Sequence, residues 1–535
     1  MFEECTPCNQ DGLKCSDDFA DLADGFWWKW RNRTHLELYK NFTKNLQNSS
    51  FSPELHNTND PGIEYPYTLP KPHRSPMVES CKGGLNSSCE AGYEGPLCAV
   101  CSDGYYKQLK KRKHCPKKRW MIGQLAIIGG LVMLLIIFIV RRSNKKSKKG
   151  AERSFVDIVL GRIKVVIGFY QVTFGIMEAF SYVKWPGSLS VIGHYSEIVQ
   201  VNVLQIAPLQ CVLPSLKFDA FARLFAVMGL NVGAVITAFA SLAIVTWIST
   251  RHNLNEAEKL KKKENIKALV KRNLFFFLYV TYLNTCLKTA QVLPLACHRV
   301  CVDEKDESCK EYLKADYSIN CKGKRYNRLV FAGYCSILYV IVLPAAAYKA
   351  IWQRQNAARK TEDQTTNLTN DFEGQGTAQT GLGFLHENYN PLCSYWELVD
   401  TFRKVILTSG LILVGGESRS YIGLALVLSG LYGILFAFKR PIIDPFENRL
   451  MLTSLAVTFV NLAIRAVSTI PSEGFTSSVD PIMDTLVFNC LVFVANSFVI
   501  GFLVGRLRYF ISTFNTSALL PMGKKVKDNH ETCIQ

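Results

Sequence analysis

Long apolar runs alternate with polar segments along most of the chain. Each run lasts about 20 residues and holds almost no acidic or basic side chain, whereas the strands of a membrane barrel are about ten residues long and alternate in polarity. The pattern therefore predicts an all-α membrane bundle of nine transmembrane helices. The predicted spans are 121–140, 160–183, 222–249, 273–292, 328–349, 400–415, 420–438, 449–467 and 483–506.

The uneven distribution of basic residues predicts the orientation of these spans. The chain has 62 Lys and Arg against 44 Asp and Glu, a net charge of +18. The loop 184–221 holds two Lys, but 250–272 holds eight Lys or Arg, and basic loops stay on the cytoplasmic side. Counting spans from that loop places the N-terminus outside and the C-terminus inside. The excess charge thus indicates topology rather than nucleic-acid binding.

Cysteines and glycosylation acceptors cluster before the first span. Eight of the 18 cysteines lie there, together with four Asn-X-Ser/Thr acceptors at Asn32, Asn41, Asn48 and Asn86. Both features are typical of an oxidising compartment and predict a plasma-membrane glycoprotein. The chain opens without the basic and apolar regions of a signal peptide, so either residues precede Met1 or the first span carries the N-terminus across.

A small module with five closely spaced cysteines is predicted at 81–119. A segment this short buries little core and needs disulfides. Exposed thiolates would oxidise in this compartment, so we expect neither a zinc site nor any other metal or cofactor. The spacing resembles a laminin-type EGF-like module, but Arg112 stands where a further cysteine often occurs, which leaves the partner of Cys115 open. The five are Cys81, Cys89, Cys98, Cys101 and Cys115.

Four more cysteines lie in the second predicted outer loop, 293–327. Their spacing predicts two disulfides that hold the ends of the fourth and fifth spans, and a redox- or ligand-sensing loop is the alternative. Cys211 is also predicted outside, where it either stays a thiol or joins this cluster. The four are Cys297, Cys301, Cys309 and Cys321.

Few polar side chains lie at membrane depth, where an unpaired charge costs at least about 3 kcal/mol. Glu178 and Lys288 form a candidate ion pair between the second and fourth spans. Amides in the spans either bridge helices, which is the commoner role, or line a hydrated path. The membrane-embedded polar candidates are Glu178, Lys288, Asn461, Arg465 and Asn489.

An aromatic and charged segment precedes the sixth span. We expect Tyr395 and Trp396 at the inner membrane interface and Arg403 reaching toward the headgroups. Glu397 is expected to pair with Arg403 or with a basic loop and to fix a short helix along the membrane. That helix is a static anchor or, as the alternative, a gating lever. The basic segment 256–272 holds the topology or, alternatively, lies on anionic lipid or binds calmodulin.

The sequence predicts four parts. Residues 1–80 form an extracellular, glycosylated region with Cys and Trp, and 81–119 form the EGF-like module. Residues 120–510 form the transmembrane domain, and 511–535 form a cytoplasmic tail. Within the transmembrane domain, 350–399 is predicted as a cytoplasmic linker because its polar composition offers little to bury.

Short motifs in the second half carry a resemblance to a known family. They are GFLHENYNP at 383–391, YWELVDTFRK at 395–404, Arg440-Pro441 with Asn448, and Tyr312-Leu-X-X-Asp316-Tyr317 ending at Cys321. These motifs resemble segments of multi-pass proteins with EGF-like ectodomains, similar to the fungal transient receptor potential-like (flavin carrier-like) membrane proteins. The resemblance covers residues 81–510 as scattered motifs and implies a cation-channel-like transmembrane domain.

The function expected from these features is that of a membrane protein without enzymatic activity, since the common nucleophile, nucleotide and metalloprotease motifs are missing. The resemblance implies a transient receptor potential-like cation channel or sensor. A cell-surface receptor or adhesion protein without ion conduction is the alternative, and a lipid or small-molecule transporter is a third option. The expected partners are membrane lipids, with a homo-oligomer and an extracellular protein ligand as further candidates.

Overall fold

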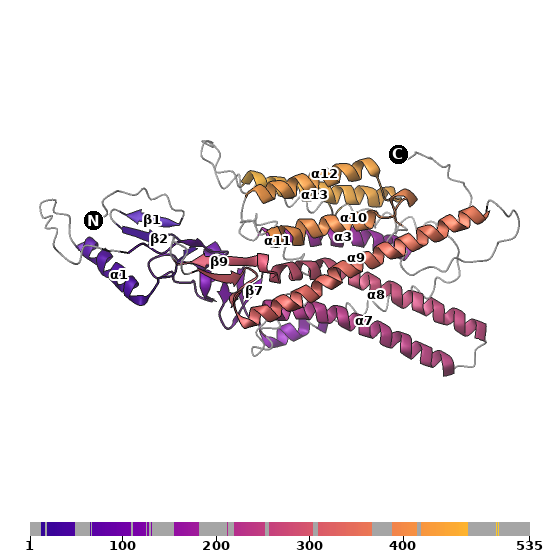
Figure 1. The fold of residues 1–535 in the computed structure, drawn as a ribbon, viewed down its shortest axis with the longest axis horizontal. Helices are drawn as coiled ribbons and strands as arrows, with labels where there is room; N and C mark the ends of the chain where they lie inside the picture. The colour runs from indigo at the N-terminus through magenta and orange to yellow at the C-terminus, as the bar shows by residue number, and fades with distance from the viewer. Residues whose placement is uncertain are drawn as a thin grey trace. The chain divides into compact units, whose positions relative to one another are not determined.

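The computed structural model of the chain forms two compact units (Figure 1). The stapled unit lies within Met1–Gln124, Ala207–Arg223 and Gln291–Tyr334, and the helical unit lies within Leu125–Ile206, Leu224–Ala290 and Cys335–Gln535. The structure describes residues 12–16, 19–48, 65, 67–108, 111–124, 126–127, 130, 155–180, 211, 219–251, 256–302, 309–365, 388–414, 419–468, 499 and 501.

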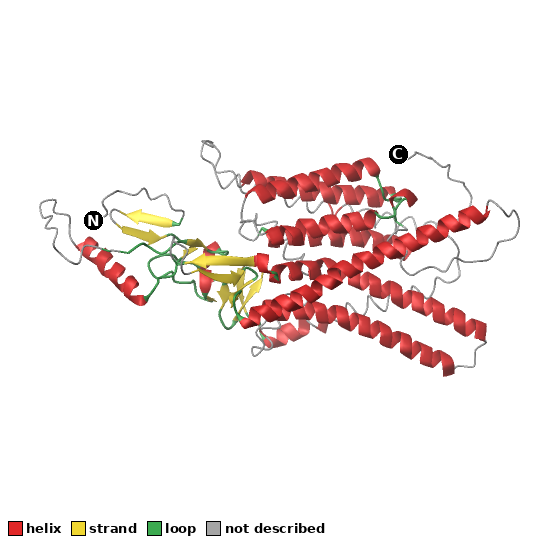
Figure 2. Cartoon of the chain, in the orientation of Figure 1, coloured by secondary structure: helices red, strands yellow, loops and turns green. Residues whose placement is uncertain are grey.

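Short antiparallel sheets build the stapled unit and are drawn in yellow in Figure 2. Strands β1 to β8 pair in sequence order as two-stranded sheets, with β3 next to β4, and β10 lies between β9 and β11. The helix α1 (Arg33–Asn48) packs Tyr39 and Phe42 against Tyr65. The strands are β1 (Leu13–Ser16), β2 (Phe19–Leu22), β3 (Phe26–Trp27), β4 (His73–Arg74), β5 (Tyr93–Glu94), β6 (Val100–Cys101), β7 (Tyr105–Gln108), β8 (Lys111–His114), β9 (Cys297–Cys301), β10 (Cys309–Leu313) and β11 (Asp316–Asn320).

Disulfides support the small core of the stapled unit, as the cysteine spacing predicts. The bonds among the described residues are Cys89–Cys98, Cys115–Cys211, Cys297–Cys321 and Cys301–Cys309. The last two close the β9–β11 sheet, where Cys301 lies opposite Cys309. A disulfide stabilises mainly by restricting the unfolded chain, and Cys115–Cys211 restricts the longest stretch, with a sequence separation of 96.

One of the predicted disulfide cysteines, Cys81, is a thiol in this structure. Cys81 is buried, and its Sγ donates to the carbonyl oxygen of Leu97 at 3.5 Å, while the adjacent Cys98 pairs with Cys89. The expectation for Cys211 is corrected as well, because it neither stays a thiol nor joins the 297–321 cluster. It supplies the partner that spacing left open for Cys115.

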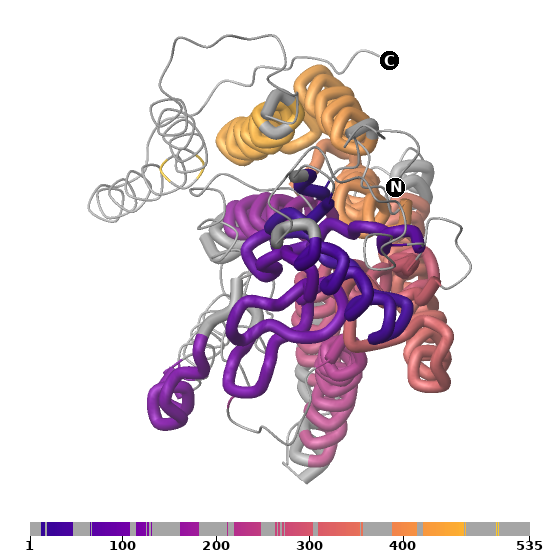
Figure 3. Tube along the Cα trace, turned by 90° about the vertical axis from the view of Figure 1, so that its left-hand side faces the viewer, coloured from indigo at the N-terminus to yellow at the C-terminus, as the bar shows by residue number. Residues whose placement is uncertain are grey.

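Long helices build the helical unit. Figure 3 shows α12 and α13, in orange and yellow, side by side, and these two helices make extensive contacts. The helices are α3 (Phe155–Ala179), α7 (Ala220–Arg251), α8 (Glu256–Val292), α9 (Lys324–Thr365), α10 (Trp396–Val405), α11 (Leu411–Val414), α12 (Arg419–Lys439) and α13 (Pro445–Ser468). A π-helix, Ile406–Gly410, joins α10 to α11.

Three of the described helices are long and apolar enough to cross a membrane: Ala220–Ile244, Lys324–Gln353 and Tyr421–Lys439. They fall on the predicted spans 222–249, 328–349 and 420–438. The spans 160–183, 273–292 and 449–467 also fall on helices, and 400–415 is divided by the π-helix. The spans 121–140 and 483–506 lie largely outside the described residues. The chain is thus a mostly helical membrane protein with three candidate spans, and the ninefold crossing stays a prediction.

Two polar segments belong to helices that extend beyond the predicted apolar spans. The helix α9 continues to Thr365, so the predicted linker at 350–399 begins as helix and ends with the start of α10. The basic segment 256–272 is the first half of α8 and runs without a break into the apolar second half. It is therefore part of a single helix that ends at Val292.

A proline inside α9 shows how neighbouring helices compensate a broken backbone bond. Pro344 has no N–H, so the carbonyl oxygen of Val340 loses its intrahelical partner. The Tyr282 hydroxyl on α8 donates to that carbonyl at 3.0 Å. An unpaired carbonyl is costly in an apolar environment. By donating to the Val340 carbonyl, Tyr282 compensates the hydrogen bond that Pro344 removes from this candidate span.

Glycines at a seven-residue spacing let α3 approach the segment that contains the π-helix. A Cβ atom at Gly168 would lie 2.8 Å from Lys404 Nζ, and one at Gly175 would lie 2.2 Å from Thr408 Cγ2. Next to this contact, Val172, Ile176 and Leu407 belong to a buried apolar cluster. The close approach therefore depends on the missing side chains of Gly168 and Gly175.

Candidate functional site

The starts of two candidate spans are bound together inside the stapled unit. Asp219 Oδ1 accepts a hydrogen bond from the backbone N–H of Ala222 at 3.0 Å, so it caps α7 at the positive end of the helix dipole. Its Oδ2 forms an ion pair with Arg325 in the first turn of α9. The backbone N–H of Ala220 donates to Asp316 Oδ2 on β11 at 3.1 Å. We call Asp219, Ala220, Asp316 and Arg325 the helix-start cluster.

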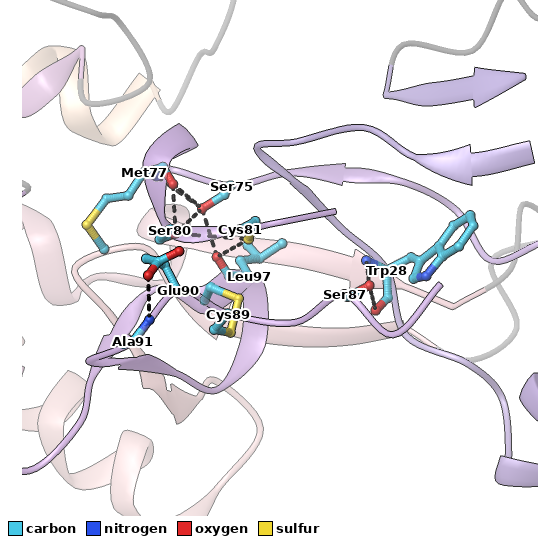
Figure 4. Close-up of a disulfide and its surroundings, with 11 residues drawn as sticks. Trp28, Ser75, Met77, Ser80, Cys81, Ser87, Cys89, Glu90, Ala91 and Leu97 are labelled. Carbon is cyan, nitrogen blue, oxygen red and sulfur yellow. Dashed lines mark hydrogen bonds between the residues drawn. A yellow bond between two sulfur atoms is a disulfide. The ribbon is translucent and has the colours of Figure 1, made fainter. Parts of the chain in front are cut away.

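The module with the Cys89–Cys98 disulfide is held to the N-terminal segment by a separate set of bonds (Figure 4). The Ser87 Oγ accepts from the backbone N–H of Trp28 at 3.1 Å and donates to its carbonyl oxygen at 3.0 Å. Around Cys81, the Ser75 hydroxyl donates to the carbonyl oxygen of Leu97 at 2.8 Å. These bonds bring residues from 28 to 97 into one small core.

The helical unit contains a buried charge network that sequence reasoning found only in part. Glu397, which is 1% exposed, accepts from Lys164 on α3 and from Tyr279 on α8. Its Oε2 also accepts from the Tyr389 hydroxyl at 2.6 Å. Burial raises the pKa of the Tyr389 phenol well above its ordinary value, and the Glu397 carboxylate raises it further, so the phenol stays a donor.

Asp400, one turn later on α10, is the second carboxylate of this network. Arg403 Nη2 lies 2.9 Å from its Oδ1, and Lys404 Nζ lies 2.6 Å from its Oδ2. The Tyr432 hydroxyl on α12 donates to Oδ1 at 3.1 Å, and the Arg403 guanidinium lies 4.7 Å from the centre of the Tyr432 ring. We call these four side chains, together with Glu397 and its partners Lys164, Tyr279 and Tyr389, the charge network.

The charge network joins four helices and the 388–393 loop. Burying ions costs several kcal/mol each, roughly, and is offset only where each charge has a partner with good geometry. Here every carboxylate oxygen of Glu397 and Asp400 accepts from at least one charged or phenolic donor. Such an arrangement holds one geometry of the helices and makes any other geometry expensive.

The interfacial candidates lie close together in sequence but differ in environment. Trp396 is buried against Tyr432 and Phe436, so it is a core residue rather than a ring that faces lipid and water. The Tyr395 hydroxyl donates to Gln355 Oε1 at 2.7 Å. The expected Glu397–Arg403 pair is replaced by two separate pairs, Glu397 with Lys164 and Arg403 with Asp400.

The described membrane-embedded candidates lie on three helices, α3, α8 and α13. Lys288 is buried on α8, Asn461 is buried on α13, and Glu178 is half-buried in the last turn of α3. Arg465 lies on α13, and Asn489 lies outside the described residues. The proposed Glu178–Lys288 pair stays a prediction.

Another amide in the spans bridges helices. Asn231 on α7 donates to Thr285 Oγ1 at 3.0 Å and accepts from Thr281 Oγ1 at 2.7 Å. This is the commoner of the two roles expected for such amides. Among the glycosylation acceptors, the side chains of Asn32, Asn41 and Asn86 are exposed, and Asn48 lies on α1.

Several site residues lacked a usable signal in the sequence. Lys164 lies 233 residues before its partner Glu397, and Asp219 lies 106 residues before Arg325. Asp400 could have been found, because Arg403 and Lys404 follow it at the three- and four-residue spacing of helical ion pairs. No group of metal ligands is present among the described residues.

Comparison with known proteins finds a family match for one segment of the chain. Residues 73–117 match a family described only as a domain of unknown function, DUF7630. The match overlaps the module predicted at 81–119 and covers the Cys89–Cys98 disulfide. No curated protein and no solved structure matches the chain.

Proposed function

We propose that the chain is a multi-pass plasma-membrane sensor, in which the stapled unit lies outside the cell and passes a signal to the helical unit. The observation that supports this proposal is the helix-start cluster. It ties α7 to α9 through Asp219 and Arg325, and it ties α7 to the β9–β11 sheet through Asp316. Both helices continue from the stapled unit into the helical unit, so a shift of the sheet acts directly on two candidate spans.

The extracellular placement rests on the same unit. Its segments are the N-terminal region and the two loops that charge counting assigns to one side of the membrane. Disulfides join two of these segments through Cys115–Cys211, and such bonds persist in oxidising compartments. The charge network is the element proposed to respond, because partnered buried charges favour one helix arrangement over others.

The coupling is tested by removing the ion pair while keeping the helix cap. In Asp219→Asn the amide still caps α7, and in Arg325→Gln the cap is untouched. We expect hydrogen exchange of the full chain in nanodiscs to speed up by up to about fivefold in the helical unit, since a partly exposed pair contributes about 0.2–1 kcal/mol. The segment to follow is 396–410. Lys14→Gln, which removes the exposed Lys14–Asp24 pair, is the control. A change confined to the helix starts would contradict the proposal.

A cation channel is the second candidate, supported by the charge network, since ionisable groups within a bundle often mark ion pathways. Whole-cell current would be recorded from the wild type and from Glu178→Ala under voltage steps, stretch and changed external calcium. A current that is absent from mock cells and altered in selectivity by Glu178→Ala supports conduction. If no current is recorded although surface expression is confirmed, the channel is contradicted and the receptor is favoured. The Asn231 bridge between α7 and α8 agrees with the receptor, because this amide joins helices.

A further inference from the structure

A half-buried histidine, His73, joins two distant segments of the stapled unit. The Nε2 atom of His73 on β4 lies 2.7 Å from the carbonyl oxygen of Cys301 and 3.2 Å from its backbone nitrogen. Next to it, the backbone N–H of Lys71 donates to the carbonyl oxygen of Val302 at 3.0 Å. We call these contacts between residues 71–73 and 301–302 the histidine seam. It holds the DUF7630 segment against the β9–β11 sheet.

The neighbours of His73 disfavour a second proton on its ring. Burial lowers the pKa of His73 below its ordinary value, the bond to the Cys301 carbonyl opposes this shift, and Lys71 lowers the pKa further. His298 on β9 lies with its ring centre 6.5 Å away. The charged and titratable groups on the His73 side are Lys71 and Arg74. Those of the β9–β11 sheet are His298 and Arg299 on β9, Lys310, Glu311 and Tyr312 on β10, and Asp316 and Tyr317 on β11.

Protonation also removes a hydrogen-bond acceptor. A neutral ring uses Nε2 either to donate to the Cys301 carbonyl or to accept from the Cys301 N–H, depending on the tautomer. A doubly protonated ring only donates, so the Cys301 N–H loses this acceptor. The added charge would also lie beside Lys71 and His298. The bond to the Cys301 carbonyl favours the charged ring, but burial and Lys71 outweigh it, so acidification weakens the seam.

We propose that the proton is a ligand of the stapled unit, bound at His73, and that its binding opens the histidine seam. The inference names a stimulus for the proposed sensor and rests on that proposal for its effect on the helices. The path to them is short, because the β9–β11 sheet that forms one side of the seam also carries Asp316, which binds the start of α7.

The sign of the pH effect follows from the direction of the shift. A histidine whose pKa is lower in the closed seam than in the open one binds fewer protons when closed. The seam is therefore fully stable above the open-state value of about 6.5 and weakens as the pH falls through it toward the lower value. Each unit of difference between the two values changes the opening equilibrium about tenfold.

The experiment is hydrogen exchange of the full chain in nanodiscs at pH 7.4 and 5.5, corrected for intrinsic exchange rates. We expect peptides 70–76 and 297–302 of the wild type to exchange severalfold faster at the lower pH, and at most about tenfold faster, because pH 5.5 lies about one unit below the open-state value. His73→Gln keeps a donor for Cys301 without a titrating ring and should lose the pH dependence. His114→Gln removes an exposed histidine of the same unit and should behave as the wild type.

Lys71→Met supplies an independent signature. Because Lys71 lowers the pKa of His73 in the closed seam, removing this positive charge should bring that pKa closer to its open-state value. The acceleration of exchange between pH 7.4 and 5.5 should then be smaller than in the wild type, whereas a merely structural histidine would show no such reduction. Unchanged protection of the wild type at pH 5.5, or an equal pH response in His73→Gln, overturns the inference. Seam opening without any change in segment 396–410 supports proton binding and contradicts the coupling on which the proposed function depends.

Discussion

Replacing Gly175 by alanine will prevent most of the protein from reaching the cell surface. The new methyl group would lie 2.2 Å from Thr408 Cγ2 and 2.6 Å from Thr408 Cβ, and Thr408 is fully buried at the π-helix. Neither residue can move away easily. The colliding atoms of Thr408 lie next to its backbone, and Gly175 is part of the helix α3. Overpacking of this kind costs about 1–3 kcal/mol. Surface biotinylation and thermal unfolding in detergent measure the loss.

The matched control for this prediction is another helical glycine. A Cβ atom at Gly423 on α12 meets no atom within 4 Å, so Gly423→Ala should be neutral or slightly stabilising through its helix propensity. The reciprocal change, Gly175→Ala with Thr408→Gly, removes the colliding atoms and should restore part of the surface expression. Equal expression of Gly175→Ala and Gly423→Ala would show that α3 does not pack closely on Thr408.

The existence of the long helices could be predicted from the sequence because apolar runs report burial in protein or lipid without reference to a partner. The span predicted at 222–249 is α7 at Ala220–Arg251, and that at 420–438 is α12 at Arg419–Lys439. The start of α8 and the end of α9 are harder to predict, because both helices include polar segments in which the hydropathy is low. Propensity and charge, rather than hydropathy, decide where such helices end.

The partners within the site could not be predicted in this way. Apolar periodicity says which residues turn inward, but it carries no information about which distant segment they meet. The Cys115–Cys211 bond and the Lys164–Glu397 pair each join segments that are adjacent only once the fold exists. Spacing within one helix is the exception, and it would have identified Asp400 with Lys404.

The two units differ in how much of their structure the sequence constrains. In the stapled unit, cysteine spacing indicates two disulfides within 297–321, and the structure contains two there, but spacing does not say which cysteines pair. In the helical unit, Trp396 was assigned to the interface from its residue type, and burial against Phe436 overrode that preference. Residue type alone predicts an environment only where tertiary packing does not compete.

Removing the carboxylate of Glu397 will destabilise the helical unit more than removing any exposed charge. In Glu397→Gln the single amide oxygen keeps only one of the bonds from Tyr279 and Tyr389, because the two hydroxyls donate to different oxygens of the carboxylate. The Lys164 ammonium also loses its counter-charge in a buried site. Leaving one member of a buried pair uncompensated costs about 3–5 kcal/mol. Thermal unfolding of the full chain in detergent measures the effect, and Glu264→Gln, at an exposed position of α8, is the control.

A double-mutant cycle then separates the pair from the packing around it. Lys164→Met keeps much of the side-chain volume and removes the charge that Glu397→Gln leaves behind. The double variant should therefore be more stable than Glu397→Gln alone, because neither buried charge remains. Strictly additive losses in the two single variants would mean that the two side chains act independently, and the charge network would then not select one arrangement of the helices.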